Sequence, residues 1–155
     1  MSDNCSGCGS QPGRREFIAV VGIAAASGLP LRLLHGLQRI AGEVRYPIPA
    51  NDSVSIDAEN EVILVRWTGH AFAFNLACPH QNTALRWQEG ERRFQCPKHK
   101  SRYQPDGNFI SGRATRGMDR LEIRRDGDVL VVNTDRVFKQ DEDPAGWDGA
   151  TASLS

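Results

Sequence analysis

Two short segments, each beginning with Cys-Pro, constrain this chain more than any other feature. The first is Cys78-Pro79-His80 and the second is Cys96-Pro97-Lys98-His99. Fifteen residues separate His80 from Cys96, which is long enough for a hairpin that brings the two segments together. Each segment then supplies one thiolate and one imidazole, both of which are ligands of iron and zinc. The spacing therefore predicts one metal centre built from two loops.

Two kinds of centre use such ligands. A structural zinc ion is possible in principle, but zinc sites usually pair Cys-x-x-Cys with His-x-x-His, whereas here each loop holds one Cys and one His. The arrangement C-x-H and C-x-x-H instead resembles the Rieske iron–sulfur family, over most of residues 55 to 133. That resemblance implies one 2Fe–2S cluster per chain, with Cys78 and Cys96 on one iron and His80 and His99 on the other. Neutral imidazoles lower the negative charge around such a cluster, which raises the reduction potential to roughly −150 to +300 mV.

The resemblance continues beyond the ligands, into residues 101–107. In Rieske proteins of cytochrome bc-type complexes, a Ser and a Tyr occupy the places of Ser101 and Tyr103. There the Ser hydroxyl donates to a bridging sulfide and the Tyr hydroxyl donates to a ligand Cys sulfur. Such hydrogen bonds stabilise the more negative reduced state and raise the potential. The alternative roles are a turn residue for Ser101 and a core aromatic for Tyr103.

Three departures from the quinol-oxidising relatives stand out. Their disulfide between the two loops is absent, because Thr83 and Lys98 stand at the corresponding places. Their Leu after the first ligand His corresponds to Gln81. Residues 111–117, which include Arg113 and Arg116, replace a Pro-rich cover loop. The polar Gln81 and the basic Arg113 and Arg116 weaken the fit to an apolar quinol pocket and would suit docking to an acidic redox partner equally well. The alternative is that both Arg face solvent.

Short strands separated by turns predict a small all-β domain over residues 43–134. The resemblance to the Rieske family implies that this domain is a Rieske fold of antiparallel sheets with an inserted cluster-binding subdomain. A run of β-branched residues and a period-two pattern of large residues flank Thr68-Gly69. Asp126-Gly127 is a second hairpin signal. The expected strands span 61–67, 71–76, 93–95, 121–125 and 128–132.

Residues 1–42 predict an export signal or membrane anchor ahead of this domain. Arg14-Arg15, one spacer, Phe17 and Ile18 resemble a bacterial twin-arginine signal. The apolar run that follows is about 22 Å long as a helix, which is short for a bilayer core of about 30 Å. Cleavage and retention as an anchor both remain open. The protein is therefore expected in the periplasm or on the periplasmic face of the inner membrane.

The remaining segments carry weaker signals. Residues 135–155 are polar and predict a solvated tail, with Trp147 as the one residue that could pack back on the domain. Cys5 and Cys8 form half a metal site without a second pair, and they leave with the signal if it is cleaved. His35 and His70 are expected to be surface or packing residues rather than ligands.

Length and charge limit the function. The chain has 155 residues and zero net charge, which excludes a generally basic nucleic-acid binder. A cluster with all its positions ligated has no place for substrate, and the chain has no room for the mononuclear iron domain of a Rieske oxygenase. One-electron transfer remains, with no catalytic site of the chain's own.

Four functional hypotheses follow. The first is the exported electron-transfer subunit of a membrane-associated oxidoreductase, with a cytochrome b/c or a molybdoenzyme subunit as partner and quinol as a possible donor. This group includes quinol–cytochrome c reductases and arsenite-oxidase-type enzymes. The second is a free-standing periplasmic Rieske carrier. A dioxygenase ferredoxin is disfavoured by Arg14-Arg15 and by the pair Ser101 and Tyr103, and a zinc-binding module would have no redox activity.

Overall fold

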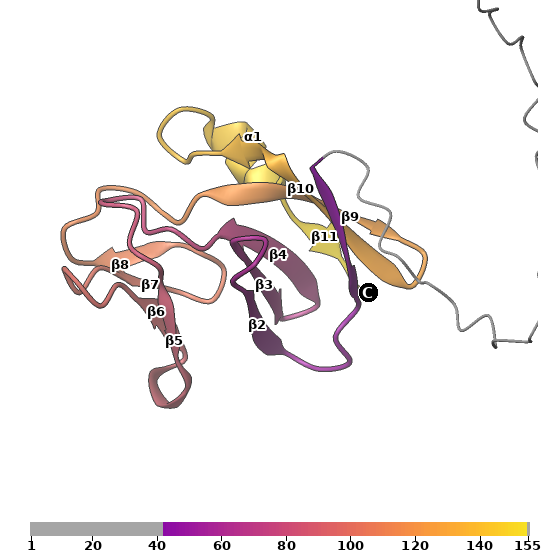
Figure 1. The fold of residues 1–155 in the computed structure, drawn as a ribbon, viewed down its shortest axis with the longest axis horizontal. Coiled ribbons are helices and arrows are strands. Elements are labelled where there is room, and N and C mark those ends of the chain that lie inside the picture. The colour runs from indigo at the N-terminus through magenta and orange to yellow at the C-terminus, as the bar shows by residue number, and fades with distance from the viewer. Residues whose placement is uncertain (1–41, 155) are drawn as a thin grey trace, which may run out of the picture. The chain divides into compact units, whose positions relative to one another are not determined.

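The computed structural model describes residues 42–154, which are built mainly from antiparallel strands (Figure 1). The predicted export segment, with Cys5, Cys8 and His35, lies outside the described residues. Within 42–154, no helix is long and apolar enough to span a bilayer. The elements are β1 (Glu43–Pro47), β2 (Ser53–Asp57), β3 (Val62–Trp67), β4 (His70–Asn75), β5 (Arg86–Gln88), the 3-10 helix η1 (Glu89–Glu91), β6 (Arg93–Gln95), β7 (Arg102–Tyr103), β8 (Phe109–Ser111), β9 (Arg120–Asp126), β10 (Val129–Phe138), α1 (Pro144–Gly149) and β11 (Ala152–Ser153).

The larger sheet has the order β1-β10-β9-β4-β3-β2, and β11 pairs with β4. Two tight hairpins set its register. Thr68 and Gly69 both have positive φ, of 48° and 79°, as a type I′ turn between β3 and β4 requires. The turn between β9 and β10 is Gly127-Asp128, one residue later than the sequence signal indicates, because Asp126 pairs with Val129.

Strands β3 and β4 are buried on both faces, which explains their continuous apolar sequence. Ile63, Val65, Phe72 and Phe74 pack into one cluster together with both site cysteines. Their sequence neighbours face a second cluster, shared with β9 and β10: Val62, Leu64, Ala71 and Ala73. A strand covered on both sides loses the alternation of apolar and polar residues that marks a half-exposed strand.

The smaller sheet, β5-β6-β7-β8, lies between β4 and β9 in the chain. In Figure 1 the smaller sheet lies at the left of the domain, beside β2–β4. Phe74 in β4 pairs directly with Arg120 in β9, so residues 76–119 form an insertion into the larger sheet. Gly107 lies against the Phe74 ring with φ of 87°, where a Cβ would overlap the ring. The predicted all-β class with an inserted subdomain is therefore confirmed.

The C-terminal segment corrects the prediction of a solvated tail. Residues 135–138 extend β10, and β11 pairs with Ala71 and His70 of β4. Trp147 in α1 is 2% exposed, and its Nε1 donates to the Met118 carbonyl at 2.7 Å. Packing of Trp147 on the domain is thus confirmed. The rest of the segment also forms regular secondary structure, despite its polar composition.

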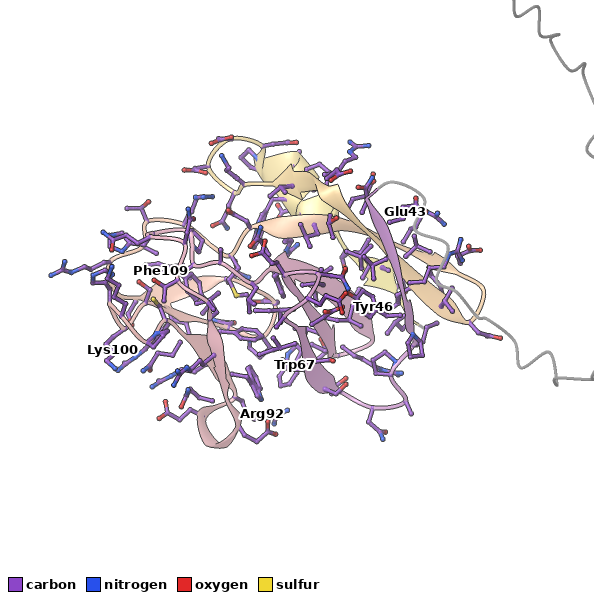
Figure 2. The ribbon with its side chains drawn as sticks, in the orientation of Figure 1. Glu43, Tyr46, Trp67, Arg92, Lys100 and Phe109 are labelled. Carbon is purple, nitrogen blue, oxygen red and sulfur yellow. The ribbon has the colours of Figure 1, made fainter. Side chains whose placement is uncertain are left out.

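Two arginines connect the insertion to the larger sheet. The guanidinium of Arg120 lies 3.6 Å from the Trp147 ring centroid and donates to the carbonyls of Trp147 and Asp106. Arg92, which follows η1, lies 4.4 Å above the ring of Trp67 (Figure 2). Burial lowers the pKa of Arg120, and three backbone carbonyls and two aromatic rings contact its guanidinium group. These contacts hold the insertion against the sheet.

Candidate metal centre

The first Cys-Pro segment forms a closed loop directly after β4. The Cys78 amide donates to the Thr83 carbonyl at 2.9 Å, and the Asn82 amide donates to the Cys78 carbonyl at 2.9 Å. Asn82 has φ of 46°, in the left-handed region that Asn adopts more readily than most residues. An isolated bridge between Ala77 and Ala84 closes the base of the loop. The backbone itself therefore fixes this loop, in which Thr83 contributes a carbonyl.

The second segment repeats the same backbone arrangement between β6 and β7. The Cys96 amide donates to the Ser101 carbonyl at 2.8 Å, and the Lys100 amide donates to the Cys96 carbonyl at 3.0 Å. Lys100 has φ of 60° and stands four residues after its Cys, as Asn82 does in the first loop. The two loops are thus equivalent in hydrogen bonding. Only the position of the His differs, two residues after Cys78 and three after Cys96.

The two cysteines meet in the interior. Both are free thiols, with Cys78 fully buried and Cys96 1% exposed. Burial raises the pKa of the Cys78 thiol, the Tyr103 hydroxyl opposes that rise, and the nearby Cys96 adds to it. The Tyr103 hydroxyl lies 3.3 Å from Cys78 Sγ. Burial and the contact with Cys78 raise the pKa of Tyr103, so its hydroxyl keeps its proton and can donate to a Cys78 thiolate.

The two histidines meet at the partly exposed end of the loops. His80 Nδ1 and His99 Nδ1 are 3.2 Å apart, and the rings stand edge to face with centroids 4.7 Å apart. Desolvation, the neighbouring His80 ring and the cations Arg113 and Lys98 lower the pKa of His99. Neutral imidazole is the form that binds metals, so this environment favours His99 as a ligand.

Ser101 is fully buried and links the second loop to residues 111–117. Its Oγ accepts hydrogen bonds from the amides of Arg113 and Ala114, each at 3.1 Å. The Ser101 hydroxyl also forms a side-chain hydrogen bond with Tyr103, which opposes the rise in the Tyr103 pKa. Gly112 has φ of 116° and packs on the Ser101 backbone, where a Cβ would overlap Ser101 Cα. The 111–117 segment therefore covers the second loop through Gly112 and two backbone amides.

These donors suit two metal ions better than one. Within residues 42–154, no three Cys, His, Asp or Glu side chains converge as ligands of a single ion. The structure instead presents a buried thiol pair and a separate imidazole pair. A tetrahedral zinc ion needs four ligands around one point, whereas a Rieske cluster takes two thiolates on one iron and two imidazoles on the other.

The structure separates the two arginines that the sequence left together. Arg116 forms two hydrogen bonds with Asp119, at 2.5 and 3.2 Å, and lies 3.3 Å from Asp141. Its positive charge is therefore compensated by these two carboxylates. The side chain of Arg113 is exposed. Gln81 and Lys98 are also exposed. His70 is exposed as well, but it lies at the start of β4 and not in either loop.

Sequence reasoning missed three positions that shape the site. Asn82 and Lys100 carry the left-handed backbone of the two loops, and Gly112 allows close packing on Ser101. A signal existed for two of them, since Asn and Gly are the residues most often found at positive φ. The role of Lys100 had no local signal and emerges only from the equivalence of the loops.

The fold and the donor set define a β-sheet iron–sulfur protein with mixed Cys and His ligands. The family model "Rieske [2Fe-2S] domain" matches residues 42–134. The chain belongs to the Rieske [2Fe-2S] domain family, and its cofactor is accordingly a Rieske-type 2Fe–2S cluster. The predicted family and cofactor are therefore confirmed.

Among curated relatives, the chain is similar to the chloroplastic cytochrome b6-f complex iron-sulfur subunit of Bigelowiella natans, with 28% identity over 110 residues. That match covers 70% of this chain and 38% of the relative. Cytochrome b6-f complex iron-sulfur subunit 2 of Synechocystis is 32% identical over 76 residues, covering 47% of this chain and 42% of the relative. The chain thus spans less than half the length of these relatives.

Among solved structures, the plasma membrane Rieske protein PetC3 from Synechocystis PCC 6803 is 22% identical, with a TM-score of 0.44. The match covers 52% of this chain and 83% of that one.

Proposed function

We propose that this chain is the electron-transfer subunit of an exported, membrane-associated oxidoreductase, in which Cys78 and Cys96 hold one iron and His80 and His99 hold the other. The observation that carries the proposal is the pair of equivalent Cys-Pro loops, which bring two buried thiols together and set two imidazoles 3.2 Å apart. When bound, a Rieske cluster accepts and releases one electron at a time.

The surrounding residues would tune and protect this centre. The Tyr103 hydroxyl lies 3.3 Å from Cys78 Sγ and can donate to a Cys78 thiolate, and the Ser101 hydroxyl forms a hydrogen bond with Tyr103. Both are buried, so water does not compete for these bonds. Hydrogen bonds that strengthen as the cluster gains negative charge raise the potential, which favours the upper part of the Rieske range.

The ligand assignment is tested by counting iron in matched histidine variants. His99→Ala removes one ligand, whereas His70→Ala removes an exposed His of β4 and serves as the control. The expected result is two irons per chain and a rhombic EPR signal after reduction in the wild type and in His70→Ala, with loss of that signal in His99→Ala. An unchanged signal in His99→Ala would overturn the assignment.

The kind of complex follows from the relatives and from the N-terminal sequence. The curated relatives named above are subunits of cytochrome b6-f complexes, which supports a cytochrome b-type partner. Arg14-Arg15 supports export by the twin-arginine route, which carries folded proteins and so allows cluster loading in the cytoplasm. In the double variant R14K/R15K, the protein should remain in the cytoplasm with its cluster. Unimpaired delivery of this variant to the periplasmic side would contradict the twin-arginine route.

A free-standing periplasmic carrier is the second candidate, because the exposed surface of the loops is polar. Gln81, Lys98 and Arg113 are exposed, whereas a quinol pocket would be lined mainly by apolar residues. Affinity purification of the native protein from detergent-solubilised membranes distinguishes the two. A stoichiometric cytochrome b or molybdoenzyme subunit supports the complex, whereas a cluster-loaded protein that purifies alone from the soluble fraction supports the carrier.

A further inference from the structure

Charge is divided unevenly between the inserted subdomain and the rest of the described chain. Residues 76–119 contain eight Arg and Lys against four Asp and Glu. Residues 42–75 and 120–154 together contain seven Arg and Lys against thirteen Asp and Glu. The chain as a whole has zero net charge, so this polarity is invisible in its composition. In Figure 2, the labelled Lys100 marks the basic subdomain and the labelled Glu43 lies away from it on β1.

Three of the basic side chains surround the ligand loops. Lys98 and Lys100 flank His99 in the second loop, and the Arg113 amide is bound to Ser101 Oγ at 3.1 Å. The charges of Lys98 and Arg113 both act on the His99 ring. All three side chains are exposed, and none of them belongs to an ion pair found within residues 42–154. We call Lys98, Lys100 and Arg113 the basic rim.

Three other basic residues of the subdomain are engaged by neighbours: Arg92 stacks on Trp67, Arg93 pairs with Glu91, and Arg116 is held by Asp119. Arg86 and Arg102 form no ion pair within residues 42–154 either. The basic rim is distinguished from these two by its place in the ligand loops and the segment that covers them, where the imidazole pair reaches the surface. Uncompensated charge of one sign attracts ligands of the opposite sign and accelerates their association.

We propose that the basic rim is the docking surface for an acidic protein redox partner, which exchanges electrons with the centre across the edge of His80 and His99. This inference rests on the proposed ligand assignment. Docking at the rim places the partner's own redox centre next to the ligands, which electron exchange requires. The described residues outside the insertion are acidic and repel the same partner. This repulsion favours approach by the basic rim.

Small redox probes test the sign of the charge at the centre. The reduced protein is mixed in a stopped-flow instrument with ferricyanide, an anion, or with tris(phenanthroline)cobalt(III), a cation. In each reaction the cluster loses one electron and the probe gains it. Raising the salt concentration screens local charge over a distance of about 10 Å at 0.1 M. The proposal predicts that the ferricyanide rate constant falls about tenfold from low to high salt, while that of the cobalt complex rises.

Two triple variants with equal change in charge separate the rim from the rest of the chain. K98Q/K100Q/R113Q removes the rim, and R124Q/R125Q/R136Q removes three exposed charges from β9 and β10. The rim variant should lose at least about threefold of the low-salt ferricyanide rate and most of its salt dependence. The β9–β10 variant should keep both. Equal effects of the two variants would mean that only net charge matters and would overturn the proposal.

Phosphatidylcholine vesicles with and without phosphatidylglycerol test a lipid surface as the alternative occupant. If the rim docks an acidic protein, the fraction of protein that floats with each kind of vesicle should be the same for the rim variant and the wild type. Rim-dependent flotation with phosphatidylglycerol, together with probe rates that do not respond to salt, would replace the protein partner by an anionic membrane. A protein without the rhombic EPR signal would instead defeat the proposed function, so the two failures remain distinguishable.

Discussion

Tyr103 shows how one side chain can adjust the centre without binding metal. Its hydroxyl is buried, keeps its proton and lies 3.3 Å from Cys78 Sγ. Tyr103→Phe should therefore keep the cluster and lower its reduction potential. If the hydrogen bond is about 1 kcal/mol stronger in the reduced state, the decrease is about 40 mV for one electron. Protein-film voltammetry measures it.

Tyr46→Phe is the matched control for that substitution. Tyr46 donates to Asp57 at 2.9 Å on β1 and β2, and it belongs to the larger sheet rather than to the ligand loops. Its replacement should leave the potential unchanged. An equal decrease in both variants would mean that Tyr103 acts on general stability rather than on the sulfur.

The lowered pKa of Asp57 predicts how the stability of the fold depends on pH. Burial raises the pKa of Asp57, but hydrogen bonds from Asn60, Glu59 and Tyr46 outweigh it, so the folded pKa lies below the ordinary value. A lowered carboxyl pKa stabilises the fold above the unfolded value of about 3.9, and that stability is lost as pH falls through the folded value.

Asp57→Asn should therefore be less stable than the wild type at pH 7, and the difference should shrink toward pH 3. Urea unfolding across this range measures the free energies. Glu59→Gln is the control, since its exposed side chain takes no part in these bonds and its curve should follow the wild type. A constant difference between Asp57→Asn and the wild type at every pH would contradict the account.

At the level of elements, the two ligand loops depend on a left-handed residue four positions after each Cys. Lys100→Gly should change stability by less than about 0.5 kcal/mol, because Gly adopts this conformation freely but loses more entropy on folding. Lys100→Val should cost about 1 kcal/mol more, since a β-branched residue is strained there. Lys98→Val removes a neighbouring charge outside that conformation and is the control. Equal losses in all three would contradict the shared loop geometry.

The C-terminal segment is the second element to test. Trp147→Ala removes a ring that covers Arg120 and donates to Met118, and it should lower the free energy of unfolding by about 3 kcal/mol. Ile110→Ala, at a side chain 46% exposed, should change it by less than about 0.5 kcal/mol. Denaturant unfolding measures both. If Trp147→Ala left the free energy of unfolding unchanged, the segment would behave as a solvated tail, which would contradict this account.

The elements also show why some of the fold was predictable and some was not. The β3–β4 hairpin is predictable because β-branched residues flank Thr68-Gly69, which forms a type I′ turn. Strands β7 and β11 have two residues each, too few to carry a period. The order of α1 depends on Arg120 and Met118, which are far from Trp147 in sequence. The proposed ligands could be identified from the sequence because Cys and His carry their chemistry locally, whereas the equivalence of the two loops lies in backbone conformation.

At the level of the whole molecule, the fold divides two tasks between its sheets. The larger sheet buries both faces of β3 and β4 and supplies the rigid base. The insertion carries the ligand loops and the basic rim, and it is held to that base through Arg92 and Arg120. The zero net charge of the chain therefore conceals a basic insertion, which carries the proposed ligands, and an acidic larger sheet. The docking proposal uses this difference in charge.

The central claim is that two thiols and two imidazoles from the equivalent loops hold one Rieske cluster. The most direct measurement is EPR spectroscopy of the dithionite-reduced full chain together with metal analysis of the same sample. The account predicts two irons per chain, a red-brown protein and one rhombic signal that disappears in His99→Ala. A colourless protein with one zinc ion per chain would contradict it.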